Sequence, residues 1–301
     1  NDEEDALEVF KSHPDCVLRI EDFAALQIHW EDKATSLRRI AEELNIGVDS
    51  LVFFDDSPVE RDWVASQLPE VRVIEFPESP MSFAGALEES GAFDQLSLSD
   101  EDRVRAEMYQ KDQERKQFQK ESVSLEEFLE RLEVSVSLGP VDETTLPRVT
   151  QLLAKTNQFN LTTRRHTSSE LKKIIGSGGI ALWGRAADRF GDIGLVGVAI
   201  AVPGDSAEWS IDTFVMSCRA LGRGVETALL SALSSRVRQR GGQVLIGEYI
   251  PTKKNGMASN FYSSQGFQPA GGSNRSWKWN LPQGEIPSPK HVKVRNESLG
   301  G

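Results

Sequence analysis

The chain has 301 residues, of which 39% are hydrophobic and 27% charged, and this favours a soluble globular protein with two domains over one. Every apolar run is shorter than the roughly 20 residues that span a bilayer, and no stretch has the pattern of a signal peptide. The net charge of −12 is unevenly placed: residues 1–140 carry 14 basic and 34 acidic residues, and residues 141–301 carry 20 and 12. A basic second half suits a phosphorylated or acidic partner, but no basic run is dense enough to indicate nucleic-acid binding.

Residues 1–96 are predicted to form a parallel α/β domain, because helical and strand patterns alternate. Apolar residues at helical spacing predict helices over residues 2–12, 32–45 and 59–67, and short apolar runs predict strands over 16–20, 51–54 and 71–76. The wholly apolar run 51–54 ends in Asp55 and Asp56, as a central parallel strand with polar residues at its carboxyl end does.

Three polar residues of this first domain are candidates for phosphate chemistry. Asp55 and Asp56 suit Mg²⁺, which prefers carboxylates together with water and phosphate oxygens. Lys33 precedes them by about a strand and a helix and could contact a phosphoryl oxygen as a point charge. The alternative is structural: Asp-Asp before Ser57-Pro58 can be a turn and helix cap, and Lys33 an exposed residue of a first helical turn.

Residues 97–133 are predicted to be a solvated helical connector, with helix starts at Ser99 and at Ser124. The second domain, residues 134–281, is predicted to be a mixed α+β domain. A first strand is expected over residues 132–138, and an antiparallel sheet is expected from strands over 181–183, 193–202, 208–216 and 244–250. Helices are expected over 146–155, 170–175, 225–240 and 258–265. Residues 282–301 contain proline and many polar residues and are predicted to be a disordered tail.

A polar loop, residues 156–166, follows the first helix of this domain. Asn157, Asn160, Thr162 and Arg164 could bind a carboxylate or hydroxyl groups. The alternative is a helix end followed by turn residues, with Thr167 or Ser168 as the cap of the next helix. The four histidines show no metal-ligand spacing, although His166 lies in this loop.

Residues 211–226 are predicted to be a buried strand, a glycine-bearing turn and the start of a helix. We name residues 219–224 the glycine loop; Arg219, Gly222, Arg223 and Gly224 are candidates for binding a phosphate, because glycines admit close backbone approach and a helix N-terminus favours an anion. Cys218 precedes this loop. Nearby arginines and a helix N-terminus favour a nucleophilic thiolate, whereas a buried core cysteine is the structural alternative.

Two other residues have simpler interpretations. Cys16 is expected in a strand and in the core, and it lies too far from Cys218 in sequence to suggest a disulfide framework, which favours a reducing cytoplasm. Tyr262 is either a general acid for a leaving thiol or a packed aromatic side chain.

The pattern Arg219-x-x-Gly222-x-Gly224, followed by Asn260-Phe-Tyr262-Ser-Ser-Gln-Gly266-Phe267, resembles the GNAT acyltransferase superfamily. The runs WEDKA (30–34), LVFFDDSPVERDWVASQLPEV (51–71), KTNQFNLTTRR (155–165) and MSCRALGRGVE (216–226) resemble the FkbH-like family, in which a HAD-IIIC-type phosphatase half is fused to a GNAT-like domain. The resemblance extends to about residue 281.

This resemblance implies an enzyme that takes a glyceryl group from 1,3-bisphosphoglycerate, removes its phosphate and loads it on the phosphopantetheine arm of an acyl carrier protein for polyketide biosynthesis. It implies that Cys218 accepts the acyl group, that Lys33 binds phosphate, and that Asp55 and Asp56 bind Mg²⁺. The family's Asp-x-Asp nucleophile motif does not occur at a suitable place, so we expect this stretch alone not to hydrolyse phosphate.

Three functions remain open from the sequence. The first is acyl transfer through Cys218. The second is N-acetyl transfer from acetyl-CoA by a GNAT enzyme with an α/β appendage. The third is a non-catalytic module that only docks a carrier protein.

Overall fold

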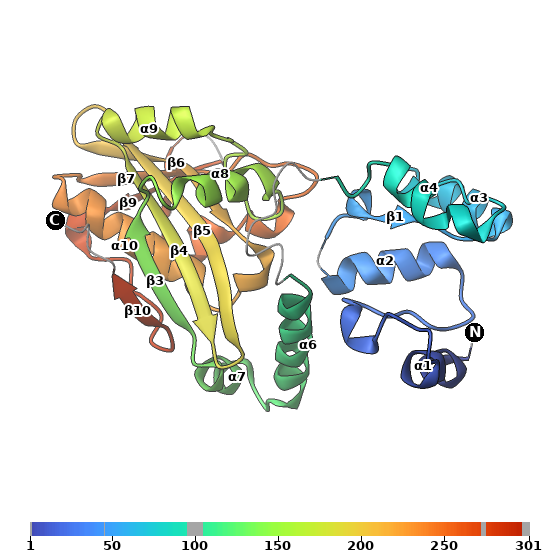
Figure 1. Ribbon diagram of the computed structural model, residues 1–301. Helices are drawn as coiled ribbons and strands as arrows, with labels where there is room; N and C mark the ends of the chain where they lie inside the picture. Colours follow the sequence, from blue (N-terminus) through green and yellow to red (C-terminus); the bar gives the residue numbers. More distant parts are fainter. Residues whose placement is uncertain (1, 45, 95–104, 272–274, 297–301) are drawn as a thin grey trace. The chain divides into compact units, whose positions relative to one another are not determined.

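A computed structural model of the chain describes residues 2–44, 46–94, 105–271 and 275–296 (Figure 1). Backbone contacts divide the chain into two compact units, Asn1–Gln113 and Glu114–Gly301. The helix start that the sequence predicts at Ser99 lies outside the described residues.

The first unit is a small parallel α/β structure, as predicted. Strands β1 (Val52–Phe53) and β2 (Arg72–Val73) pair in parallel, and α3 (Pro58–Gln67) connects them. Ser57 caps α3 by accepting a hydrogen bond from the Glu60 N–H at 3.3 Å, and Pro58 occupies the first turn. The other helices and 3-10 turns are α1 (Glu3–Ser12), η1 (Ile20–Asp22), α2 (Lys33–Leu44), η2 (Val48–Ser50), η3 (Pro80–Ser82) and α4 (Phe83–Glu89). The core of the unit consists of apolar side chains from α2, α3 and the strands.

The strand predicted over residues 16–20 is wrong. This segment has no strand partner among the described residues, and Val17 in its middle is 90% exposed. The Cys16 thiol donates locally to the Leu18 carbonyl at 3.2 Å, so Cys16 is half-buried in a loop and not in the core. Apolar side chains without a sheet to cover cannot hold a strand in place.

The second unit is built on one sheet of eight strands in the order β10-β3-β4-β5-β6-β7-β9-β8. The strands are β3 (Ser135–Pro140), β4 (Ile180–Asp188), β5 (Gly191–Pro203), β6 (Glu208–Met216), β7 (Val244–Glu248), β8 (Gln268–Pro269), β9 (Ser276–Asn280) and β10 (Lys293–Asn296). Strands β4, β5 and β6 pair antiparallel, as predicted. Strand β7, predicted in the same antiparallel sheet, pairs in parallel with β6, and β10 pairs in parallel with β3. A parallel pair needs a crossover, and α10 (Val225–Gln239) supplies it between β6 and β7.

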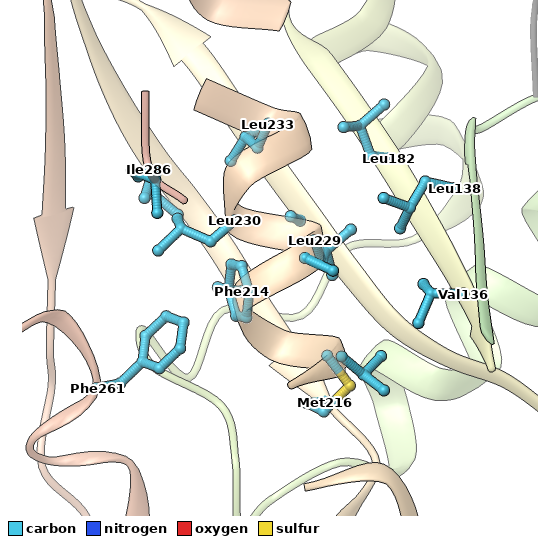
Figure 2. Close-up of a cluster of buried hydrophobic side chains, with 14 of the residues drawn as sticks. Val136, Leu138, Leu182, Phe214, Met216, Leu229, Leu230, Leu233, Phe261 and Ile286 are labelled. Carbon is cyan, nitrogen blue, oxygen red and sulfur yellow. The ribbon is translucent and has the colours of Figure 1, made fainter. Parts of the chain in front are cut away.

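Helices cover both faces of this sheet. On one face α8 (Leu146–Lys155) and α9 (Ser168–Gly176) bury side chains such as Leu153 and Leu171 against Val198 of β5. On the other face α10 buries Leu229, Leu230 and Leu233 in a larger cluster that includes side chains of β3, β4 and β6 (Figure 2). Because helices cover both faces of the sheet, successive side chains of β5 and β6 are buried on opposite faces, and these strands therefore have long apolar runs in the sequence. The short helix α11 (Phe261–Ser264) and the turns η4 (Cys218–Ala220), η5 (Gly256–Ala258) and η6 (Leu281–Gln283) complete the unit.

The predicted connector packs more closely than a solvated bridge would. Helix α6 (Arg105–Glu121) crosses the division between the units, and α7 (Leu125–Leu132) follows it, capped by Ser124 as predicted. In the second unit, Phe128 and Leu132 of α7 are buried, and Phe118 of α6 packs against the same core. Residues 114–133 are therefore part of the second unit.

The C-terminal segment, residues 285–296, also belongs to this unit, so the prediction of a disordered tail is wrong there. Strand β10 pairs with β3, and the Ser231 hydroxyl of α10 donates to the Ile286 carbonyl at 2.7 Å. Ile286 is 1% exposed and lies beside Leu230 in the main core (Figure 2). A few apolar residues among polar ones are enough to order a segment when they reach a core.

Among the described residues, no helix combines the length and the apolar character that crossing a membrane requires.

Candidate functional site

Cys218 lies where β6 ends. The strand runs to Met216, Ser217 hydrogen-bonds to Val196 of β5 at 2.7 Å, and Cys218 then opens the 3-10 turn η4. The neighbours Phe214 and Met216 are fully buried, whereas Cys218 is half-buried and is not in a disulfide. The sheet therefore fixes the backbone on one side of the thiol, and the thiol itself is outside the core.

The glycine loop follows, and both of its glycines have the backbone that the sequence predicts. Gly222 and Gly224 have φ angles of 72° and 86°, in the left-handed region that favours glycine. Gly224 is also the residue before α10, and a Cβ atom there would lie only 2.9–3.0 Å from Pro289, His291 and Val292. Glycine is therefore required by both the turn and the C-terminal segment packed on it.

The N–H groups of this loop already have an anion. The Glu226 side chain turns back from the first turn of α10, and its Oε1 accepts from the Gly222 N–H at 3.2 Å. Burial raises the pKa of Glu226, although the N–H groups of Glu226, Gly222 and Gly224 and the nearby His291 act in the opposite direction. A phosphate that binds at this helix N-terminus must displace the carboxylate.

Arg223, predicted as a phosphate ligand, turns into the protein instead. Its Nη1 atom lies 3.6 Å from Oδ2 of Asp188, and its side chain is 15% exposed. Arg115 of α6 contacts the same carboxylate through two hydrogen bonds of 2.6 and 2.9 Å, and Asp188 is completely buried. A buried carboxylate needs nearby cations to offset its loss of hydration. The ion pair of Arg223 with Asp188 therefore ties the glycine loop to β4. Arg219 is half-buried in η4.

The polar loop lies along the same strand as Cys218. Its Leu161 N–H donates to the Phe214 carbonyl at 3.1 Å, and its Phe159 carbonyl accepts from the Met216 N–H at 3.0 Å. The Leu161 carbonyl accepts from the Ile250 N–H at 2.7 Å, so the loop fills the space where β6 and the chain after β7 diverge. The structure thus brings the loop to the end of β6 that leads to Cys218.

The predicted binding residues of the polar loop divide into two groups. Asn157 and Asn160 line a cavity, described further below. Thr162 and Arg164 contact β6 instead: the Thr162 hydroxyl donates to the Asp212 carbonyl at 2.7 Å, and Arg164 forms an ion pair with the Asp212 carboxylate at 2.8 Å. Thr167 caps α9 in a capping box with Glu170, as the structural alternative predicted.

His166 has a partner that the sequence analysis missed. Its Nε2 atom lies 2.6 Å from Oδ2 of Asp212 and 3.2 Å from the Thr213 hydroxyl. Burial acts to raise the pKa of Asp212, but hydrogen bonds from Thr213 and His166 and the charges of His166 and Arg164 lower it overall. Asp212 is a charged residue within the otherwise apolar strand 211–216, and this pattern could have indicated that it has a partner such as His166.

Tyr262 lies in the core. Its side chain is 1% exposed, and a Cβ atom on Gly247 would meet its ring at 2.3 Å. Burial, with the Glu248 charge nearby, raises the pKa of the Tyr262 hydroxyl. This place fits the packed aromatic side chain that the sequence left open, and we give Tyr262 no role in the proposal below.

Asp55 and Asp56 follow β1, as predicted. Oδ1 of Asp55 accepts from the Ser57 N–H at 2.9 Å, which makes the turn before α3, and Asp56 is exposed. Lys33 is half-buried at the start of α2, and within the described part of the chain it forms no ion pair with Asp55 or Asp56. No group of three metal-binding side chains occurs among the described residues. Two carboxylates fit Mg²⁺ as part of a ligand set but do not complete one.

Comparison with known proteins gives partial likenesses only. No family model matches the chain, and no curated protein matches it. A solved structure of the N-terminal part of a Bacteroides fragilis protein, containing a phosphatase domain complexed with Mg, shares 41% identity over 33% of this chain, with a TM-score of 0.32. The chain spans only 26% of that structure's length.

Other solved structures resemble about half of the chain. A GNAT-family acetyltransferase from Staphylococcus aureus Mu50 has 14% identity and a TM-score of 0.38, covering 48% of this chain and 99% of its own. An acetyltransferase from Salmonella typhimurium, solved with acetyl-CoA, has 15% identity and a TM-score of 0.36, covering 48% and 94%. Each of these likenesses covers only part of this chain.

Proposed function

We propose that the second unit is an acyltransferase that carries an acyl group on Cys218, and that this group is glyceryl, taken from 1,3-bisphosphoglycerate and delivered to an acyl carrier protein. The observation that supports this most is the place of Cys218. The residue follows a rigid strand, precedes the glycine loop and lies at the end of β6 along which the polar loop runs.

Two steps account for the transfer. The Cys218 thiolate attacks the carbonyl carbon of the acyl phosphate, a C–S bond forms, and the C–O bond to phosphate breaks with release of phosphate. The thiolate of the carrier's phosphopantetheine arm then attacks the thioester, takes the acyl group, and returns the electron pair to Cys218. A thioester suits this sequence because it remains activated toward a second thiol.

Glu226 disfavours the alternative donor, acetyl-CoA. The diphosphate of CoA, if it bound at the glycine loop, would have to replace a carboxylate that already accepts from the Gly222 N–H. Arg223 would have to leave Asp188 to assist it. A single phosphate on a flexible arm has less charge to bring to this loop, so Arg219, Gly222 and Gly224 stay in the proposal as the place where the arm approaches.

Removal of the second phosphate would involve Lys33, Asp55 and Asp56 of the first unit, with Mg²⁺ to polarise the phosphoryl group. It would also need an aspartate nucleophile, for which the sequence 1–301 has no Asp-x-Asp motif at a suitable place. The carboxylates of the described residues form only part of a magnesium site.

The test is intact-mass analysis of the protein after incubation with the acyl phosphate and no carrier protein. One adduct should appear on the peptide that contains Cys218: phosphoglyceryl where the second phosphate stays on the acyl group, and glyceryl where that phosphate has been removed. Cys218→Ala should lose the adduct and at least 100-fold of the rate of carrier loading, whereas Cys16→Ala, which removes the other thiol, should keep both. If Cys218→Ala loads the carrier at the normal rate, transfer is direct and the proposal is wrong.

A further inference from the structure

A cavity of about 270 Å³ in the second unit lies between the polar loop and the loop that follows β7. The polar loop contributes Thr156, Asn157, Asn160 and Arg165, and the other loop contributes Lys253 and Lys254. Of these, the sequence analysis considered only Asn157 and Asn160. The three cations come from segments almost 90 residues apart along the chain, so no local pattern could place them together.

One buried side chain fixes the two loops to each other. Asn255 is 0% exposed, and its Nδ2 donates to the carbonyls of Asn160 at 2.8 Å and of Ile250 at 2.9 Å. Its Oδ1 accepts from the Thr252 N–H at 2.7 Å and lies 3.2 Å from the Tyr249 hydroxyl. Both ends of the amide are thus fully used, and the walls of the cavity are held in place before any ligand binds.

The cavity offers donors and positive charge. Arg165 donates to Asn157 Oδ1 and to the Ala154 carbonyl, which fixes the guanidinium at the rim. Asn160 is 2% exposed, and its Oδ1 accepts from the Thr163 N–H at 2.8 Å. Within the described part of the chain, its Nδ2 has no hydrogen-bond partner.

The lining that the structure describes contains no carboxylate. Cations and amide donors converging on one hollow without an acid recognise an anion, and a phosphate group accepts several hydrogen bonds at once.

We propose that this cavity binds the phosphate group of a small phosphate ester, with Arg165 and Lys253 supplying charge and Asn160 a buried donor. The binding of a phosphate ester is argued from the cavity itself, and only the identity of the ester rests on the proposed acyl transfer. The polar loop bonds to Met216, two residues before Cys218, so a ligand held here lies at the same end of β6 as the thiol. Two sources have this chemistry: a phosphorylated three-carbon donor and the 4′-phosphopantetheine arm of a carrier protein.

Binding to the whole chain is measured by titration calorimetry, with inorganic phosphate, 3-phosphoglycerate and 4′-phosphopantetheine as probes and glycerate and pantetheine as their unphosphorylated controls. We expect one phosphorylated probe to bind at least tenfold more tightly than its control, and which one it is identifies the source. Arg165→Gln and Lys253→Gln should each weaken that binding about tenfold. Lys173→Gln removes the same charge from the exposed surface of α9 and should leave it unchanged.

Two results would overturn the proposal: no discrimination between either phosphorylated probe and its control, or equal binding by Lys253→Gln, Arg165→Gln and the Lys173→Gln control. Thermal melting of each variant shows whether the fold is kept. Cys218→Ala should bind the phosphorylated probe as the wild type does. The cavity can therefore fail while the thioester forms, and the thioester can fail while the cavity binds, so the two proposals are tested separately.

Discussion

Glu226 accepts from the Gly222 N–H, which the glycine loop would otherwise offer to a ligand at the start of α10. A helix N-terminus favours an anion, and here the chain provides one itself. Burial disfavours the charged form of this carboxylate and therefore raises the pKa of Glu226. The folded chain holds a proton on this carboxyl more readily than the unfolded chain does.

The first prediction concerns the pH dependence that follows from Glu226. Because its folded-state pKa is raised, stability is fully present below the pKa of an unfolded glutamate and is lost as the pH rises through the folded-state pKa. Glu226→Gln, which keeps an acceptor for the Gly222 N–H, should remove this loss. In urea unfolding between pH 4 and pH 8, the wild type should therefore lose more stability than the variant. Glu208→Gln, at an exposed position on β6, is the control, and parallel curves for Glu226→Gln and wild type would contradict the prediction.

Among the elements, the C-terminal segment supports the site from outside it. Pro289, His291 and Val292 pack against Gly224, and His291 Nε2 lies 3.0 Å from the Arg223 carbonyl. The segment then continues into β10 at the edge of the sheet. The glycine loop is thus held by Asp188 on one side, through Arg223, and by the C-terminal segment on the other.

The second prediction tests whether this segment is part of the core. Ile286→Ala should lower the free energy of unfolding by about 2–5 kcal/mol, because it leaves a cavity beside Leu230 in a fully packed cluster. Val294→Ala, at a position that is 37% exposed on β10, should cost less than about 1 kcal/mol. Equal and small effects of the two substitutions in urea unfolding would show that the segment contributes little.

At the scale of the whole molecule, the side chains that form the core of the second unit come from α6 and the residues that follow it. Its apolar clusters draw on side chains from Phe118 to Val292, and the buried ion pair of Arg115 with Asp188 lies inside the same range. The boundary of the second unit therefore precedes the predicted one at residue 134 by about two helices.

The third prediction follows from this boundary. A fragment of residues 114–301 should unfold cooperatively, with a midpoint within a few degrees of the matching transition of the whole chain. A fragment of residues 134–301 loses Phe128, Leu132 and Arg115, so that Asp188 keeps only the more distant Arg223 as a cation. This fragment should be less stable by about 3–5 kcal/mol. Differential scanning calorimetry compares the two, and equal midpoints would mean that α6 and α7 are dispensable.

The sequence by itself determined much of the local structure. Apolar spacing predicted α8 and β6 with the bounds that the structure has. Ser124 was predicted as a cap, and Thr167 as one of two possible caps, because capping depends on residues only three positions apart. The positive φ angles of Gly222 and Gly224 were also predictable, because they depend on the residue type alone.

Only the tertiary structure decided what these pieces contact. It turned Arg223 toward a carboxylate on β4, placed Glu226 over the N–H groups of the glycine loop, and joined Asn160 to Asn255 across 95 positions of the chain. It also ordered residues 285–296, whose polar composition favours disorder, because Ile286 and Val292 reach a core built by other strands and helices. A periodic pattern reports the neighbours within one element, whereas charge pairing and burial depend on which distant elements pack together.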